Sequence, residues 1–326
     1  MLIWPYLEKK KRKKKRKKKD FEPWGKKERY WVLGVLLITI LTSGILAMSA
    51  RGWKLPGLPR ISLPSFGSGT IIIEKKKGEL DEAAKETIAS FEEKTKDLSG
   101  VYGLYVVRLN SGDSYGIFQN ETFQAASLIK LPVMAALYME EEKGNLNMDD
   151  EYVLKDEDKV GGSGSLYGEP EGTVLTYEDL VRYMGHESDN TAFNIAVKIL
   201  GEDKVREVIQ EIGMINTSYD DNETTPYDVG LFFKKLWEGE IVSKEARDKI
   251  LGYLTDTIYE EWLAAGIPSD IDVAHKYGRE VHVVNDAGIV FTDDPFVLVI
   301  LSKGVVEREA DQVFPELSKI IYNKEH

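Results

Sequence analysis

The chain has 326 residues, of which 42% are hydrophobic and 30% charged, as in a globular protein long enough to bury a core. It contains no cysteine, which excludes disulfides, thiolate metal sites, a cysteine nucleophile and a lipidated-cysteine anchor. The formal net charge of −12 is divided unevenly: residues 1–29 hold 14 Lys or Arg against 4 Asp or Glu, so the rest carries −22. An acidic domain behind a short basic arm is unusual for a nucleic-acid binder, and we expect no nucleic-acid partner.

A long uncharged segment follows the basic arm. An unbroken run of eleven Lys and Arg spans Lys9–Lys19, and the 21 residues Tyr30–Ala50 then contain no charge. About 20 apolar residues at a rise of about 1.5 Å cross a hydrocarbon core of about 30 Å, and aromatic residues such as Trp53 flank such spans. We therefore predict a single transmembrane helix at 30–50, a basic cytoplasmic segment at 1–29, and the remainder outside the cell membrane.

Other interpretations of these two segments stay open. The small-x-small pattern Ala47-Met48-Ser49 would suit cleavage of a signal peptide, although the apolar region is longer than the usual 7–15 or so residues. A buried core helix is unusual at this length. The basic run alone is also typical of a nuclear-localisation or nucleic-acid patch. Its position before the apolar segment favours anionic lipid instead, so we expect membrane lipid to contact residues 30–50 and Lys9–Lys19.

A tether and a single domain are expected beyond the span. Residues 51–73 contain Pro56, Pro59 and Pro64 with several glycines and no helical period, which indicates an extended Pro/Gly-rich linker. The remaining residues, 74–326, are expected to form one outer domain.

The elements of that domain follow from periodicity and turn signals. Helices and strands alternate in a defined order: an amphipathic helix at 79–98, strands at 101–109 and 115–118 around a turn at 111–113, and a helix at 127–143. Residues 146–175 read as irregular. The remaining expected elements are helices at 176–186, 190–200, 202–212, 226–238 and 243–253, strands at 281–291 and 296–302, and a helix at 307–323 that Pro315 would kink or divide.

The order of these elements predicts the fold class. Strands occur at both ends of the domain and helices fill its middle, so we expect an α/β (α+β) fold: an antiparallel sheet flanked by helices, with an all-helical lobe inserted between its halves. A cleft between the two lobes is a natural place for a site.

Three short motifs have the composition of an active site. Ser127 and Lys130 are three residues apart at the expected start of a helix, so they share a face near the positive end of the helix dipole. A neutral lysine amine beside a serine hydroxyl can take its proton. Ser188-Asp189-Asn190 stands at the start of another expected helix, and His275-Lys276-Tyr277-Gly278 precedes the strand at 281–291. Taken singly, each motif also fits a helix cap or a solvated charge.

Together the motifs resemble the penicillin-recognising serine hydrolases, which comprise class A β-lactamases and D,D-peptidases. Their order and the longer matches Phe123-Gln-Ala-Ala-Ser127-Leu-Ile-Lys130, Ser188-Asp-Asn-Thr-Ala192 and Thr224-Thr225-Pro226-x-Asp228 are most similar to the class A branch. The resemblance covers roughly residues 75–326. It implies a β-lactamase/transpeptidase-like fold.

The resemblance also assigns roles. It implies that Ser127 is the acylated nucleophile, Lys130 its base partner and Ser188 the group that passes a proton to the leaving nitrogen. Asn190 would bind the substrate amide and Lys276 its carboxylate. Gly278 and Arg279 complete the third motif, with the backbone N–H groups of Ser127 and Arg279 as the oxyanion hole.

Two departures from the class A pattern affect these expectations. Tyr277 stands where the family usually has Thr or Ser, so carboxylate binding there is in doubt and the Arg279 side chain is a candidate replacement. The family's Glu-x-x-Leu-Asn loop motif is absent before Thr224. Four carboxylates remain nearby, but they fit turn, cap and helix-end roles better: Glu211, Asp220, Asp221 and Glu223.

These observations leave three functional hypotheses. The first is a membrane-anchored β-lactamase-like hydrolase that acts on β-lactam or D-Ala-D-Ala-like amides through an acyl-enzyme. The second is a cell-wall D,D-carboxypeptidase or penicillin-binding protein with slow deacylation, and the third a non-catalytic sensor of β-lactams or peptidoglycan. We expect a β-lactam or a peptidoglycan stem peptide as partner, a monomer, and no cofactor or metal, since the four histidines lack ligand spacing.

Overall fold

The computed structural model describes residues 25–49 and 81–326. The chain divides into two compact units, Met1–Phe66 and Gly67–His326. In the first unit, helix α1 spans Lys26–Ser49 and covers nearly all of the segment at 30–50. No helix in the two described ranges combines the length and apolarity needed to cross a membrane. The basic run Lys9–Lys19 and the expected linker at 51–73 lie outside the described residues.

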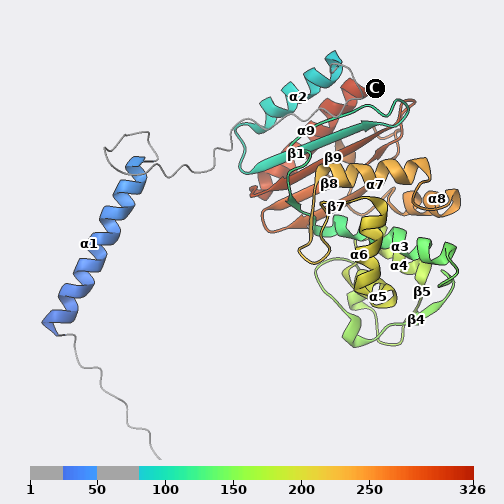
Figure 1. The fold of residues 1–326 in the computed structure, drawn as a ribbon, viewed down its shortest axis with the longest axis horizontal. Coiled ribbons are helices and arrows are strands. Elements are labelled where there is room, and N and C mark those ends of the chain that lie inside the picture. The colour runs from blue at the N-terminus through green and yellow to red at the C-terminus, as the bar shows by residue number, and fades with distance from the viewer. Residues whose placement is uncertain (1–24, 50–80) are drawn as a thin grey trace, which may run out of the picture. The chain divides into compact units, whose positions relative to one another are not determined.

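The second unit is built on a five-stranded antiparallel sheet in the order β2-β1-β9-β8-β7 (Figure 1). Strand β1 pairs with β2 on one side and with β9 on the other, which joins the two ends of the domain sequence as predicted. The strands span Val101–Arg108 (β1), Ser114–Ile117 (β2), Val273–Glu280 (β7), Val283–Val290 (β8) and Phe296–Lys303 (β9).

Helices cover both faces of this sheet because its strands are apolar on both sides. Side chains of β9 alternate between two cores, with Leu298 and Ile300 in one and Val297 and Val299 in the other. Helices α2 (Glu82–Thr95) and α9 (Glu307–Glu325) lie together over the first core, and α7 (Pro226–Glu238) packs on the second (Figure 1). Helix α9 continues through Pro315, so the expectation that this proline divides it is wrong.

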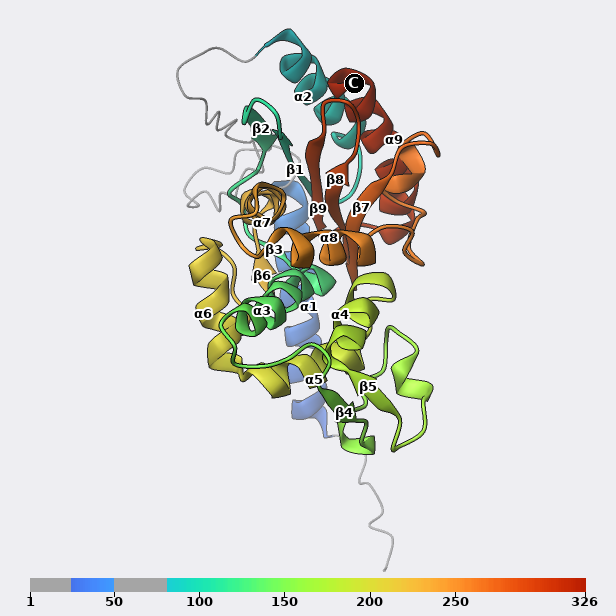
Figure 2. The same cartoon turned by 90° about the vertical axis from the view of Figure 1, so that its right-hand side faces the viewer.

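The inserted helices form the second lobe, away from α2 and α9 (Figure 2). Helix α3 is its centre, since all but its last two residues are buried. All five helices expected between residues 176 and 253 are confirmed: α7 and, in addition, Tyr177–His186 (α4), Asn190–Leu200 (α5), Glu202–Ile212 (α6) and Lys244–Tyr253 (α8). Helix α3 spans Lys130–Glu142.

Three parts of the structure differ from the sequence-based prediction. Residues 146–175 are not wholly irregular, because β4 (Glu151–Val153) pairs with β5 (Val174–Thr176). A second short pair joins β3 (Phe123–Gln124) to β6 (Glu223–Thr224). The motif expected to precede the strand at 281–291 lies within β7, the edge strand of the sheet, whose charged and polar residues conceal its β character.

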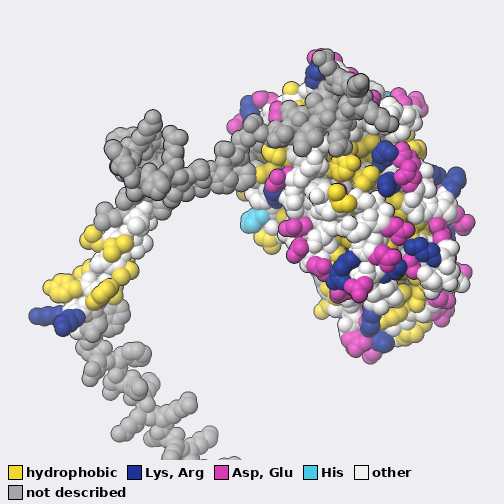
Figure 3. Space-filling model, in the orientation of Figure 1, with side chains coloured by type: hydrophobic (Ala, Val, Ile, Leu, Met, Phe, Trp, Pro, Cys, Tyr) yellow, Lys and Arg dark blue, Asp and Glu magenta, His cyan; other side chains and the backbone are white. Residues whose placement is uncertain are grey.

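The acidic character of the domain is spread over its surface. Acidic and basic side chains are interspersed on the face shown in Figure 3. Many form ion pairs between neighbouring positions on one helix, such as Lys234 with Glu238 at 2.6 Å. Such surface pairs typically contribute little stability.

Candidate active site

The first motif lies in a tight turn that enters α3. A 3-10 turn over Ala126–Ile129 carries Ser127, and α3 then begins at Lys130. Ala126 has a φ of 49°, a left-handed conformation that costs a non-glycine residue free energy. This strained residue directly precedes Ser127, so the local backbone is held in a conformation that the surrounding packing must impose.

Lys130 is the centre of a cluster of oxygen atoms. Its Nζ lies 3.1 Å from Ser127 Oγ, 2.7 Å from Asn190 Oδ1, and 2.5 Å and 3.3 Å from the carbonyl oxygen and Oγ of Ser188. The lysine is 2% exposed. The structure therefore brings together four of the predicted site residues, from two motifs about 60 residues apart in sequence.

Burial changes the protonation of this lysine. Desolvation lowers the pKa of Lys130 to about 7, against a smaller opposing effect from the negative charge of Asp189. A pKa near 7 allows the amine, whose Nζ lies 3.1 Å from Ser127 Oγ, to lose its proton near neutral pH. This arrangement suits a general base that removes the hydroxyl proton.

The second motif combines a structural residue with two site residues. Asp189 caps α5, where its Oδ1 accepts from Ala192 N at 2.8 Å and its Oδ2 accepts from Leu166 N at 2.9 Å. A β-carbon at Gly164 would lie 2.0 Å from Asp189, so only glycine fits there. The helix-cap interpretation is thus confirmed for Asp189, while Ser188, at a left-handed φ of 53°, and Asn190 face Lys130.

The third motif lies on β7, which packs against the turn that carries Ser127. A β-carbon at Gly278 would lie 3.0 Å from Ser127 N and 2.8 Å from Leu128 Cδ1, so the absence of a side chain permits this approach. Lys276 is 1% exposed. Desolvation and then the charge of Lys130 lower its pKa well below the ordinary value, which shows that the two lysines influence each other.

The side chain of Tyr277 is directed away from this cluster. Alternation along β7 places it on the opposite face from Lys276, where it is 5% exposed. Its ring stacks on Trp262, with ring centroids 3.8 Å apart, and on Tyr259 at 5.2 Å. Arg279 lies on the same face and donates to Asp311 at 3.0 Å. The structure therefore does not bring the side chains of Tyr277 and Arg279 to Ser127.

The segment before α7 is short and tightly held. Asp228 is fully buried, and its Oδ2 accepts from Asn216 N at 2.8 Å and from Thr217 Oγ1 at 2.9 Å. Three of the nearby carboxylates bond to other partners: Asp220 to Arg206, Asp221 to Ser218 and Glu211 to Lys143; Glu223 is exposed on β6.

An aromatic pair lies beside Lys130. The Phe193 ring centroid lies 5.9 Å from Lys130 Nζ, and Tyr219 from the short segment packs on Phe193 with centroids 6.5 Å apart. Sequence analysis missed both residues. The helical period from Asn190 to Phe193 indicates only that they share a face of α5, and nothing in the sequence brings Tyr219 there.

A second buried cluster lies behind the third motif and was also missed. His275, expected to be a sheet-edge residue of no special role, is on the edge strand but fully buried. Its Nδ1 lies 2.8 Å from Asp286 Oδ1 and its Nε2 lies 3.2 Å from Glu260 Oε1. Within the described residues, no group of three or more His, Cys, Asp or Glu is arranged to hold a metal ion.

Fold and site together are typical of a serine hydrolase, with a serine hydroxyl beside a buried lysine. Comparison with known proteins identifies the family: the model of the β-lactamase enzyme family matches residues 83–324. The chain belongs to that family, which confirms the resemblance found in the sequence.

Individual relatives have low sequence identity to this chain, but the matches cover most of each protein. β-Lactamase VEB-1 of Pseudomonas aeruginosa is 24% identical over 251 residues, which cover 68% of this chain and 84% of the relative. The crystal structure of a β-lactamase from Sphaerobacter thermophilus matches with a TM-score of 0.67 and 27% identity, covering 74% of this chain and 96% of that one. A mutant of PBP-A in an acyl-enzyme complex with penicillin-G matches with a TM-score of 0.67 and 25% identity, covering 74% and 95%.

Proposed function

We propose that the outer domain forms an acyl-enzyme through Ser127 with β-lactams or D-Ala-D-Ala-like amides and hydrolyses it. The observation that carries this proposal is the buried Lys130 amine, with its lowered pKa, 3.1 Å from Ser127 Oγ. The β-lactamase and penicillin-bound relatives support the choice of substrate.

The residues then have defined roles in acylation. The Ser127 oxygen forms a bond to the amide carbonyl carbon as its proton passes to the Lys130 amine. The C–N bond breaks when Ser188, whose Oγ is 3.3 Å from Lys130 Nζ, delivers a proton to the leaving nitrogen. The backbone N–H groups of Ser127 and Arg279 would stabilise the oxyanion, which the close approach at Gly278 supports.

Substrate binding is assigned to the remaining residues of the motifs. The Asn190 amide donates to Gly161 O at 2.9 Å and accepts from Lys130, which orients it at the mouth of the cluster for the substrate amide. Lys276 is assigned to the substrate carboxylate, whose negative charge would favour the protonated amine there. For Tyr277 we propose a packing role in place of the carboxylate contact, because its ring stacks on both Trp262 and Tyr259.

The second candidate function is a penicillin-binding protein or D,D-carboxypeptidase with slow deacylation. It is favoured by the region beside Lys130, where Phe193 and Tyr219 pack and the nearby carboxylates bond to other partners. A deacylating water needs a base, and an aromatic ring cannot act as one. A sensor that is acylated without turnover is the limiting case of this function.

Time-resolved intact mass spectrometry of the protein with penicillin-G tests these functions. An adduct that forms and decays while hydrolysed drug accumulates would establish a β-lactamase, and a stable adduct would establish the penicillin-binding alternative. Ser127→Ala should remove the adduct, whereas Ser269→Ala, at an exposed position, should keep it. Labelling of the Ser127→Ala protein would contradict the proposed nucleophile.

We also propose that residues 30–50 anchor the protein in the cell membrane with the catalytic domain outside. The support is the uncharged 21-residue segment after eleven consecutive Lys and Arg. The full chain should stay with membranes after an alkaline wash, and protease added to intact cells should remove the domain. Release by the wash, or protection from the protease, would contradict this location.

A further inference from the structure

Tyr259 joins β7 to the helical lobe beside the second motif. It lies in the segment between α8 and β7. Its hydroxyl oxygen is 2.7 Å from Ser163 Oγ, and these two hydroxyl oxygens lie 3.3 Å and 3.1 Å from Glu187 O. Glu187 directly precedes Ser188, yet the acylation steps proposed above do not use Tyr259.

The segment that carries Tyr259 is attached to β7. The Tyr259 ring stacks on Tyr277, and Tyr259 N donates to Thr257 Oγ1 at 3.1 Å. Thr257 donates from N and Oγ1 to Glu260 Oε1 at 2.7 Å and 2.9 Å, and the same oxygen lies 3.2 Å from His275 Nε2. The buried histidine cluster therefore fixes the backbone from which Tyr259 extends.

On the helical lobe, the tyrosine reaches a turn in a strained conformation. Ser188 has a left-handed φ of 53°, which costs a non-glycine residue free energy and persists only where the surroundings impose it. Ser165 N donates to Glu187 Oε2 at 3.0 Å, and the Glu187 carbonyl accepts from the hydroxyls of Ser163 and Tyr259. Because this carbonyl belongs to the peptide that leads into Ser188, bonds to its oxygen help to hold Ser188 in place.

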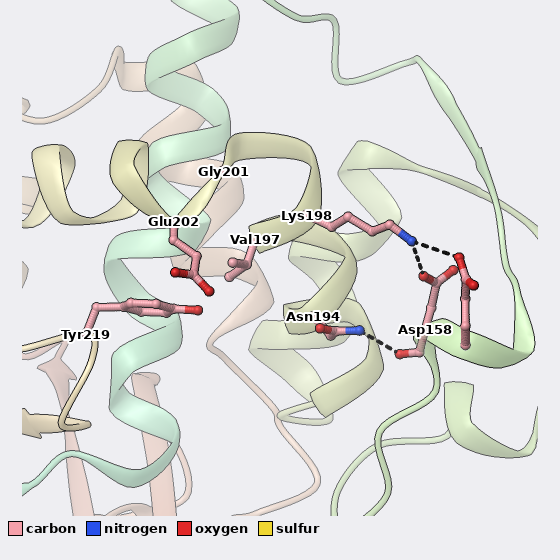
Figure 4. Close-up of a pocket in the computed structure, with 8 residues that line it drawn as sticks. Asp158, Asn194, Val197, Lys198, Gly201, Glu202 and Tyr219 are labelled. Atoms are coloured by element: carbon pink, nitrogen blue, oxygen red, sulfur yellow. Dashed lines mark hydrogen bonds and ion pairs between the residues drawn. The ribbon is translucent and has the colours of Figure 1, made fainter.

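The loop that carries Ser163 has further bonds to α5 that do not involve Tyr259. Ser163 O accepts from Asn190 N at 3.1 Å. Farther from the site, Asn194 Nδ2 donates to Asp158 O at 3.0 Å (Figure 4). Loss of the Tyr259 hydroxyl should therefore loosen the Ser188 turn while the loop and Asn190 keep their places.

We propose that Tyr259 is a positioning residue, whose hydroxyl sets Ser188 relative to the strand that carries Lys276. This inference rests on the proposed function, because the position of Ser188 matters to a reaction in which it protonates a leaving nitrogen. It also gives a consequence to the unusual Tyr277 of the third motif. The Tyr277 ring supports the Tyr259 ring and so contributes to the site through the Tyr259 hydroxyl.

Tyr259→Phe tests this role, since it removes the hydroxyl and keeps the ring that stacks on Tyr277. Rapid-quench intact mass spectrometry of the full chain, at a series of penicillin-G concentrations, gives three quantities: the dissociation constant of the initial complex, the limiting acylation rate constant and the fraction of protein that reacts. We expect the limiting rate constant to fall roughly threefold to tenfold, the size of one or two net hydrogen bonds. The other two quantities should change by less than about twofold, because the lost contact acts on the chemical step.

The matched control is Tyr115→Phe, at the opposite edge of the sheet from β7. The Tyr115 hydroxyl donates to Glu325 Oε1 at 2.7 Å, and its loss should leave the limiting rate constant unchanged. A substitution that only weakens the fold lowers the fraction that reacts, and leaves the rate constant of the folded molecules as it was.

A double variant tests whether the effect passes through the Glu187 carbonyl. Ser163→Ala removes the other hydroxyl bonded to this oxygen and should slow acylation to a similar extent. Tyr259→Phe with Ser163→Ala should be about as slow as the slower single variant, because residues that act through one contact are not additive.

The outcomes separate this inference from the proposed function. An unchanged limiting rate constant in Tyr259→Phe, an equal loss in Tyr115→Phe, a loss confined to the dissociation constant, or single losses that multiply in the double variant would overturn the positioning role. Each would leave the hydrolase function standing. Should Tyr259→Phe fail to fold, an unchanged rate constant in Ser163→Ala would overturn the role. No adduct with the unaltered protein would overturn the proposed function itself.

Discussion

Strand β7 carries a buried lysine on one face and a buried histidine on the other, and their surroundings shift the two pKa values in opposite directions. On one face Lys276 is buried beside Lys130, and burial followed by the like charge lowers its pKa. On the other face His275 lies against Asp286 and Glu260; burial alone would lower its pKa, but these carboxylates outweigh burial and raise the pKa to about 9. Adjacent residues of one strand thus have opposite shifts.

The difference separates groups that hold the fold from groups that perform chemistry. The histidine cluster fastens β7 to β8 through Asp286 and to the segment before it through Glu260 and through Leu263 N, which donates to Asp286 Oδ2 at 3.0 Å. Paired in this way, the buried charges stabilise one arrangement. Among the described residues neither lysine forms an ion pair, and burial lowers the pKa of both, which is a pattern typical of functional sites.

The largest expected effect is on the acylation rate when Lys130 is replaced. Lys130→Met removes the base that faces Ser127, so acylation by penicillin-G should fall roughly 10²–10⁴-fold. The melting temperature should hold or rise, because a buried amine is replaced by an apolar side chain of similar length. Rapid-quench mass spectrometry and thermal unfolding measure the two quantities. A large loss of stability without loss of acylation would reverse our assignment of this lysine.

The next largest effect is expected on the free energy of unfolding when His275 loses its partner Asp286. Asp286→Asn leaves His275 without its closest carboxylate, and removal of one member of a buried ion pair typically costs about 3–5 kcal/mol. Denaturant unfolding should show this loss in the free energy of unfolding. Asp311→Asn, at a partly exposed ion pair with Arg279, is the control and should cost about 1 kcal/mol or less. Equal losses for the two variants would contradict the structural role that we assign to the buried pair.

The histidine cluster should also make stability depend on pH. A folded-state pKa raised from 6.5 to about 9 means that the contribution of His275 is complete below pH 6.5 and is lost as pH rises through about 9. The difference in unfolding free energy between the protein and His275→Gln should therefore shrink between these pH values, by on the order of 2–3 kcal/mol. A difference that grows with pH would mean that His275 is buried in its neutral form.

The smallest effect is expected at Arg279. Its guanidinium bonds Asp311 on the face away from Ser127, and its proposed catalytic contribution is the backbone N–H, which substitution keeps. Arg279→Ala should therefore change acylation by less than about threefold, which is within the range of an exposed ion pair. A larger loss, confined to substrates that carry a carboxylate, would instead support the guanidinium as the carboxylate contact.

Much of this arrangement could be predicted from the sequence, because its strongest signals are local. The helical period of α4–α8 and the apolar runs of β1 and β9 predicted the lobes, and the spacing of Ser127 and Lys130 predicted that their side chains meet. Strand β7 was missed because His275 to Glu280 contains charges where a strand usually has apolar residues.

Other features depend on contacts between distant residues. Asp286 and Glu260 lie 11 and 15 residues from His275, and neither has a motif that announces the cluster. The sequence shows that Tyr277 replaces the usual Thr or Ser of the family, but it does not show where the tyrosine side chain lies. Only the alternation of side chains along β7 shows that the Tyr277 ring stacks on Trp262, on the face opposite Lys276.

The pH dependence of Ser127 acylation tests the central claim most directly. The measurement is the rate of adduct formation between the full chain and penicillin-G from pH 5 to pH 9, by rapid quench and intact mass. Because the Lys130 amine must be neutral to accept the proton, and its pKa is about 7, the rate should rise with pH and level off above that value. A rate that is flat or falls across this range would show that the buried lysine is not the base.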